Sequence, residues 1–287
     1  MSHLIVSRRD LEFVLHEWLD IAALTTRPAF ADHSRETFDA AFDIYERMAV
    51  DHFAPHNKSS DRNEPTILDG GVQVIPEVGK ALNHFASSGL LAAAHEAEFG
   101  GMSLPYAVER AGMVFMLAAN CSTTSYAFLT QANANLLLSY GTKNQIERYV
   151  RPMLTGRYLG TMCLSEPQAG SSLGDITTRA ELQSDGSYRL FGSKMWISGG
   201  EHEISENIVH LVLAKVPLAD GRLPAGSKGI SLFLVPRLLD CGEPCGAKND
   251  ISVIGLNHKM GQRGVVNCAL NFGDGRFLPG GKAGALG

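Results

Sequence analysis

The sequence predicts an α+β protein of two parts, an all-helical N-terminal domain over residues 1–157 and an antiparallel β-barrel or sandwich over residues 158–287. Two observations carry this prediction. Apolar residues recur at helical spacing through the first part, and short runs rich in Val, Ile, Leu and Tyr alternate with turns through the second. The regular alternation of strand and helix that builds a parallel sheet is absent, so a doubly wound fold is not expected.

The first helices are expected to be amphipathic. One apolar stripe with charges behind it is formed by Leu11, Val14, Leu15, Trp18 and Leu19. A second apolar stripe follows over residues 38–49, with Ser34 as a plausible N-cap and Pro55 ending the helix. Further helices fit residues 72–88, 105–119, 122–139 and 143–153, with Pro105 suited to a first helical turn.

The second part is expected to be strands joined by turns. A strand over residues 158–164 leads into it, and later runs rich in strand-forming residues cover 179–183, 187–198, 207–216, 228–236 and 265–272. The tetrapeptide Ser-Asp-Gly-Ser at 184–187 is typical of a hairpin turn.

Composition excludes several classes of function. The formal net charge of -5 gives no basic surface for nucleic acid. The longest apolar run, residues 111–119, is far shorter than the roughly 18 residues that a membrane helix needs, and no secretory signal begins the chain. Five cysteines, an odd number, favour a reducing compartment over a disulfide framework, so we expect a cytoplasmic protein.

No metal site is expected. Cys241 and Cys245 have the spacing of half a zinc site, but a second pair of ligands is missing. His52 and His56 have a similar spacing, with Pro55 between them to end the helix. Neither a dinucleotide-binding glycine pattern nor a P-loop is present.

Three polar stretches stand out in or beside the predicted strands. Residues 164–180 follow a buried strand with hydroxyls and bare amides that suit an anion or a heteroaromatic edge, although a plain surface turn has the same composition. Trp196 lies on a short strand and could equally be a core residue. Lys259 and Arg263 share a glycine-flanked turn, where they could meet phosphate or carboxylate or simply be solvated.

Taken together, the motifs MCLSEPQAGS (162–171), GSKMWIS (192–198) and HKMGQRG (258–264) resemble the acyl-CoA dehydrogenase family in order and spacing. The resemblance runs from about Leu11 to the last residue. Residues 199–216 and 228–236 are more particularly similar to the branch that contains 3-methylmercaptopropionyl-CoA dehydrogenase.

The resemblance implies a β-barrel against which FAD lies, and it assigns residues to that site. The residues expected to contact the flavin pyrimidine ring and ribityl chain are Met162, Cys163, Leu164 and Ser165. The residues expected to flank the isoalloxazine ring are Trp196, Ile197 and Ser198. Ser171 would face the CoA thioester or the flavin pyrophosphate, and Arg263 would lie near bound acyl-CoA. The polar loop would thus be completed by a flavin edge and a pantetheine chain.

Two departures from the family pattern affect the expected mechanism. Ser172 replaces an aspartate that usually follows the loop serine. The family's C-terminal helical bundle, which carries the glutamate base and reaches FAD across a dimer, is absent. Glu166 precedes a proline and is better interpreted as a structural acceptor than as a replacement base, so no catalytic residue is assigned.

We therefore expect a fragment of an FAD-dependent acyl-CoA dehydrogenase that is inactive by itself. The complete protein would be a homo-oligomer that oxidises an acyl-CoA substrate and passes electrons to an electron-transfer flavoprotein or a similar acceptor. Two alternatives remain open: a non-catalytic binding or scaffold fragment of the same fold, and a flavin oxidase or monooxygenase of that fold.

Overall fold

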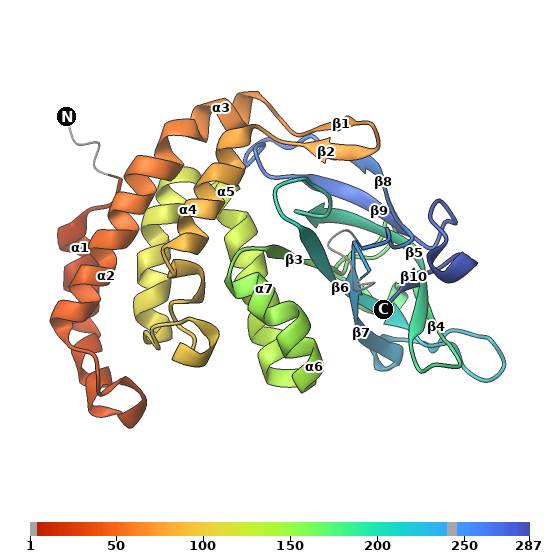
Figure 1. Cartoon of the computed structure of the whole chain (residues 1–287), viewed down its shortest axis with the longest axis horizontal. Helices are drawn as coiled ribbons and strands as arrows, with labels where there is room; N and C mark the ends of the chain where they lie inside the picture. Colours follow the sequence, from red (N-terminus) through yellow and green to blue (C-terminus); the bar gives the residue numbers. More distant parts are fainter. Residues whose placement is uncertain (1–4, 240–245) are drawn as a thin grey trace.

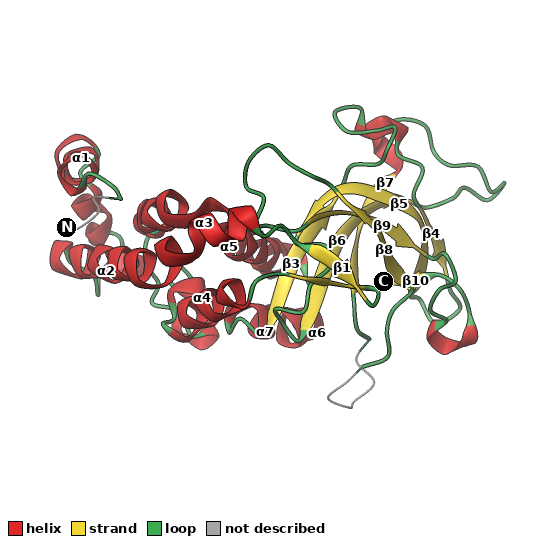
Figure 2. Cartoon of the chain, turned by 90° about the horizontal axis from the view of Figure 1, so that it is seen from above, coloured by secondary structure: helices red, strands yellow, loops and turns green. Residues whose placement is uncertain are grey.

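The computed structural model describes residues 5–239 and 246–287, and places helices before a curled mixed sheet (Figures 1 and 2). The helical half ends at Leu154, and the first strand of the sheet begins at Tyr158. This order confirms the predicted fold class. Cys241 and Cys245 lie outside the described residues.

Short helical pieces surround one long helix in the first half. The α-helices are α1 (Arg8–Glu12), α2 (Arg35–Met48), α3 (Asn57–Arg62), α4 (Pro76–Ser87), α5 (Tyr106–Tyr140), α6 (Lys143–Gln145) and α7 (Arg151–Leu154). π-helical turns cover Phe13–Trp18, Ala49–Phe53 and Ile146–Val150. In this half 3-10 turns cover Ile21–Thr26, Pro28–Phe30, Ala54–His56, Leu90–Ala92 and Ala97–Phe99. Among the described helices, none is both long and apolar enough to cross a membrane.

The predicted start of α2 is confirmed, but the predicted end is wrong. Ser34 caps the helix through a reciprocal pair of hydrogen bonds with Thr37. Pro55 does not end the helical path, which continues to Arg62. A π turn followed by a 3-10 turn places Pro55 at the start of a new turn, where its missing N–H is not needed.

Two helices were predicted over residues 105–139, and the structure joins them at a break in α5. Asn120 has extended backbone angles (φ -159°, ψ 89°) inside an otherwise helical segment. Its side-chain oxygen accepts the Thr123 amide at 3.0 Å, which is the bond of an N-cap, and its amide donates to the Phe53 carbonyl. Asn120 therefore begins the second half of the helix.

A β-hairpin interrupts the half that was predicted to be all helical. β1 (Thr66–Leu68) and β2 (Gly71–Gln73) pair through a turn at Asp69 and Gly70, which both have positive φ. An Asp-Gly dipeptide suits this turn, so the sequence held a hairpin signal that the helical interpretation overlooked. The helix expected from residue 72 begins at Pro76 instead, and the hairpin reaches across to β8 (Figure 1).

The second half is a curled sheet (Figure 2). Its strands are β3 (Tyr158–Cys163), β4 (Arg179–Leu182), β5 (Tyr188–Ser198), β6 (Asn207–Lys215), β7 (Ile230–Pro236), β8 (Ile251–Leu256), β9 (Asn267–Phe272) and β10 (Ala285–Leu286). The strand order is β3-β6-β4-β5-β9-β8, with β7 on β6 and β10 on β5. Short 3-10 turns at Leu173–Asp175, Ser227–Gly229 and Pro279–Gly281 lie in the connecting loops.

An antiparallel sheet was expected from the sequence, but the observed sheet also contains a parallel pair of strands. β3 runs parallel to β6, from Tyr158 opposite Asn207 to Cys163 opposite Val212. Parallel strands begin at the same end of a sheet, so the chain must cross back to that end between them, and a tight hairpin is too short to do this. Here the polar loop and two strands lie between β3 and β6 in sequence and provide that connection. All the predicted strands are present, with the hairpin turn at 184–187, whereas β8 and β10 were not predicted.

α5 joins the two halves. The Asn133 amide donates at 3.0 Å to the carbonyls of both Thr161 on β3 and Val209 on β6. Gly160 donates its N–H to the Thr130 hydroxyl, and a Cβ at position 160 would lie 2.4 Å from the Asn133 amide nitrogen. Apolar residues of α5, α7 and β6 pack around this junction in one buried cluster. The parallel strand pair is therefore held directly against the helical half.

Candidate functional site

The two motifs assigned to one site by sequence meet in the structure. The backbone carbonyl of Ser165, just beyond β3, accepts a hydrogen bond from the Met195 amide of β5 at 2.9 Å. The Lys194 ammonium also donates to the Leu164 carbonyl at 3.1 Å. Residues 162–165 and 194–198 therefore lie side by side, although β3 and β5 are not neighbours in the sheet.

Trp196 projects from an irregularity in β5. The pairing of β5 with β9 shifts between Lys194 and Ile197, and Trp196 has a φ of 63°, a left-handed conformation that is uncommon for a bulky residue. Its side chain is 58% exposed, so the alternative of a core tryptophan is wrong. A large aromatic surface is instead presented to solvent beside the Ser165 backbone, and such strain is found preferentially at functional positions.

The other apolar members of the predicted set divide between two environments. The Cys163 and Ile197 side chains are buried in the core of the curled sheet, so only their backbone atoms could meet a ligand. Burial raises the pKa of the Cys163 thiol to about 12, which leaves it protonated and unreactive. Met162, on β3, and Leu164, directly after β3, are half-buried.

The three predicted serines differ in how their hydroxyls are engaged. Ser198 accepts a hydrogen bond from the Asn267 amide at 3.2 Å, and the same amide reaches the Trp196 carbonyl at 3.3 Å. Within the described part of the chain, the hydroxyls of Ser165 and Ser171 have no hydrogen-bond partner. Ser171 is exposed in the loop, and Ser165 is half-buried.

Glu166 is a structural acceptor, as predicted. Its side chain is 2% exposed and pairs with the Lys194 ammonium at 2.9 Å. Burial by itself would raise the pKa of this carboxyl group, but hydrogen bonds from Thr178, Thr177 and Lys194 outweigh it and lower the pKa to about 2. Lys194 had not been singled out from the sequence, although it lies inside a recognised motif.

Arg263 lies on the turn between β8 and β9, against α3. Its guanidinium meets the Asp61 carboxylate at 2.8 Å and the Glu64 carboxylate at 3.6 Å. The Lys259 ammonium points back into the turn and donates to the Val265 carbonyl. Proximity of Arg263 to acyl-CoA remains a prediction.

The metal-like spacing in the helical half does not form a metal site. The ring of His52 stacks on His84 at 4.1 Å, and the ring of His56 meets the Thr123 hydroxyl at 2.8 Å. Over residues 5–239 and 246–287, no group of histidine, cysteine and acidic side chains has an arrangement suited to a metal ion.

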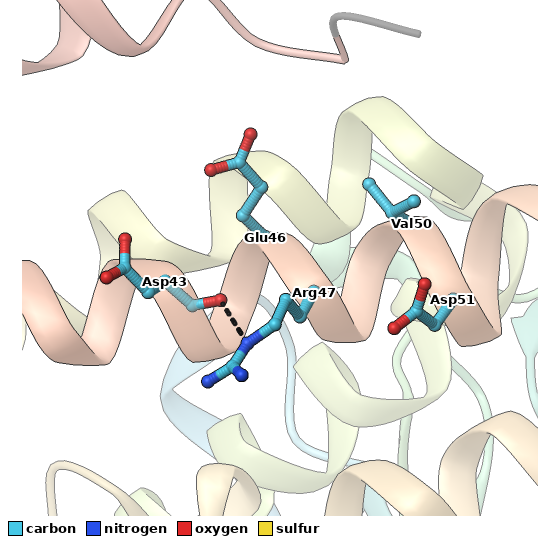
Figure 3. Close-up of a pocket in the computed structure, with 5 residues that line it drawn as sticks. All are labelled: Asp43, Glu46, Arg47, Val50 and Asp51. Carbon is cyan, nitrogen blue, oxygen red and sulfur yellow. Dashed lines mark hydrogen bonds between the residues drawn. The ribbon is translucent and has the colours of Figure 1, made fainter. Parts of the chain in front are cut away.

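A separate hollow of about 450 Å³ lies on the outer side of α2 (Figure 3). Its lining residues are Asp43, Glu46, Arg47, Val50 and Asp51. Figure 3 shows the Arg47 side chain turned to the Asp43 carbonyl, 3.3 Å from its Nε. The Asp43 and Glu46 carboxylates both pair with the Arg8 guanidinium, at 2.9 Å and 3.2 Å. This hollow contains no residue of the predicted site.

Comparison with known proteins gives the same assignment over the two halves. Residues 38–157 match the acyl-CoA dehydrogenase N-terminal domain, and residues 161–274 match the acyl-CoA dehydrogenase middle domain. The chain is 36% identical to 3-methylmercaptopropionyl-CoA dehydrogenase of Ruegeria pomeroyi over 269 residues, which cover 92% of this chain and 44% of that protein. The chain thus spans less than half the length of this relative.

Solved structures share the fold. Butyryl-CoA dehydrogenase from Megasphaera elsdenii has a TM-score of 0.66 at 21% identity, over 88% of this chain and 59% of that one. An acyl-CoA dehydrogenase complexed with FAD from Bacillus anthracis has a TM-score of 0.58 at 21% identity, over 89% of this chain and 37% of that one. With these matches and the converging motifs, the chain belongs to the acyl-CoA dehydrogenase family, whose N-terminal and middle domains it carries.

Proposed function

We propose that this chain forms the FAD-binding part of an enzyme that oxidises acyl-CoA thioesters between Cα and Cβ. The observation that carries the proposal is the hydrogen bond from Met195 to Ser165, which brings the residues assigned to the flavin from two motifs into one place. FAD, when bound, supplies the acceptor for the hydride that leaves Cβ.

The residues at this place fit a flavin. An exposed aromatic face at Trp196 offers stacking area to a flat ring system. The Ser165 hydroxyl, which has no partner in residues 5–239 and 246–287, can donate to or accept from a polar ring edge. The Ser198 hydroxyl keeps its own hydrogen free to donate while it accepts from Asn267. Cys163 and Ile197 would contribute backbone atoms alone, since their side chains are in the core.

Removal of the α-proton is not assigned to this chain. Glu166 is the carboxylate nearest the site in sequence, but both its oxygens are occupied and its pKa is about 2, so it is a poor proton acceptor near neutral pH. We therefore propose that the base is supplied by a further domain and that this chain alone does not turn over acyl-CoA.

The remaining assignments follow from the family. Ser171 and Arg263 are proposed to contact acyl-CoA, with the domains divided at residue 157. An electron-transfer flavoprotein or a similar protein is proposed as the electron acceptor, the complete protein is proposed to be a homo-oligomer, and its proposed location is the cytoplasm.

Titration of FAD into the chain tests the proposal. Quenching of FAD fluorescence should report weak, saturable binding, and Ser165→Ala should weaken it because a donor at the ring edge is lost. Ser231→Ala, at an exposed position on β7, is the matched control and should bind FAD like the wild type. Absence of saturable binding to the wild-type chain, or equal binding by Ser165→Ala, would contradict the assignment.

A further inference from the structure

One carboxylate organises the whole polar loop between β3 and β4. Glu166 Oε2 accepts from the Thr177 amide (2.7 Å), the Thr177 hydroxyl (2.9 Å) and the Gln168 amide group (2.7 Å). Glu166 Oε1 accepts from the Thr178 amide (2.9 Å), the Thr178 hydroxyl (2.5 Å) and the Lys194 ammonium (2.9 Å). Both ends of the loop are therefore fixed to one buried group, with exposed Ser171 between them.

Lys194 connects this group to β5. Its side chain is fully buried, and its ammonium divides its hydrogen bonds between Glu166 and the Leu164 carbonyl. The next residue, Met195, donates its amide to Ser165, and β5 leaves its regular pairing directly afterwards. Lys194 therefore holds the end of β3 at the point where Trp196 turns outward.

We propose that the Glu166–Lys194 pair is a positioning device, which sets the distance between the Ser165 segment and the Trp196–Ser198 segment. This inference rests on the proposed FAD site. Neither side chain can touch a cofactor, because each is at most 2% exposed. Their effect on FAD would pass through the backbone of residues 164–165 and 194–196, as outer contacts around a bound metal act through its ligands.

Stability by itself does not account well for such a pair. The free-energy cost of removing two charges from water offsets much of the attraction between them, and a neutral, well-packed replacement often gives a protein of equal stability. Removing one partner is different, because an unpaired buried charge is left behind. The double variant Glu166→Gln/Lys194→Met therefore separates the two roles, since it removes both charges and leaves none unpaired.

The test compares FAD affinity and folding in matched variants. At a temperature where every variant is folded, Glu166→Gln/Lys194→Met should bind FAD about tenfold more weakly than the wild type, the scale on which outer contacts affect a bound metal. Arg157→Met/Glu206→Gln removes an exposed pair just before β3 and β6 and should change nothing. Val235→Ala lowers stability from a buried position on β7 and should leave FAD affinity unchanged.

Amide hydrogen exchange without FAD gives an independent measurement. In the double variant, the amides of Thr177, Thr178 and Met195 should lose protection together, whereas Val235→Ala should leave Met195 protected relative to the rest of β5. The positioning role would be overturned if the double variant bound FAD with wild-type affinity. It would also be overturned if amide exchange in the double variant rose at residues 177–178 but not at Met195. If the wild type itself binds no FAD, the proposed function fails, and the exchange at Met195 still decides whether the pair couples the two segments.

Discussion

Replacing His210 by asparagine should make the protein more resistant to acid. His202 and His210 are both completely buried, and the Nε2 atom of each has no hydrogen-bond partner in the described residues. Burial, assisted by the positive charge of Arg237, lowers the pKa of both rings to about 3. An asparagine at position 210 can keep the bond that His210 Nδ1 makes with the Thr161 hydroxyl at 2.7 Å, and it does not titrate.

The size of the effect follows from proton linkage. The folded rings have a pKa below the value of about 6.5 for an unfolded histidine, so the unfolded chain binds more protons in acid. Their contribution to stability is complete above pH 6.5 and is lost as the pH falls toward 3. Between pH 7.5 and 5.0, each ring should lower the free energy of unfolding by about 2 kcal/mol, or about 4 kcal/mol for the two.

Urea unfolding followed by circular dichroism at the two pH values measures this difference. The His210→Asn variant should lose about 2 kcal/mol less than the wild type between pH 7.5 and 5.0, with an unchanged m-value. Ser231→Ala, an exposed substitution that adds or removes no titratable group, is the control and should keep the wild-type pH dependence. Equal pH dependence in His210→Asn and the wild type would refute the claim that His210 is held neutral by burial.

Three further predictions concern the site and the junction. Trp196→Ala should change the free energy of unfolding by no more than about 0.5 kcal/mol in urea, because the ring is exposed; a loss of several kcal/mol would restore the core interpretation. Ser198→Ala should weaken FAD binding by about 0.5–1.5 kcal/mol with an unchanged thermal midpoint, and unchanged affinity would remove Ser198 from the site. Gly160→Ala should destabilise by about 1–3 kcal/mol because its Cβ would collide with Asn133. At Gly255, no other part of the described chain comes within 4 Å of an added Cβ, so Gly255→Ala should be close to neutral; equal effects of the two would contradict the steric argument.

Features that depend on neighbouring residues were predictable from sequence. The Ser34 cap, the hairpin turn at 184–187 and the change from helices to strands all follow from spacing and turn chemistry. The division of α5 was also expected, and Asn120 supplies the reason, since its side chain caps the helix that follows.

Features that depend on distant residues were not predictable in the same way. The parallel register of β3 with β6 and the burial of Lys194 arise from contacts across the sheet, which single-strand patterns do not encode. The exposure of Trp196 results from a bulge, and an isolated tryptophan on a strand gives no sign of it. The motifs predicted that residues 162–165 and 196–198 lie close together, which the structure shows, but they did not reveal the buried pair that joins these segments.

The two hydrogen bonds of Asn133 bear on how the chain folds as it is synthesised. α5 can leave the ribosome before β3 exists, and β3 before β6, so the carbonyl of Val209 is the last of the three groups to appear. Bringing Val209 to Asn133 closes a long loop of chain, and the loss of conformational entropy precedes the contacts that compensate for it. The junction should therefore form late, and until then the apolar surface around Asn133 stays open to chaperones and to neighbouring nascent chains.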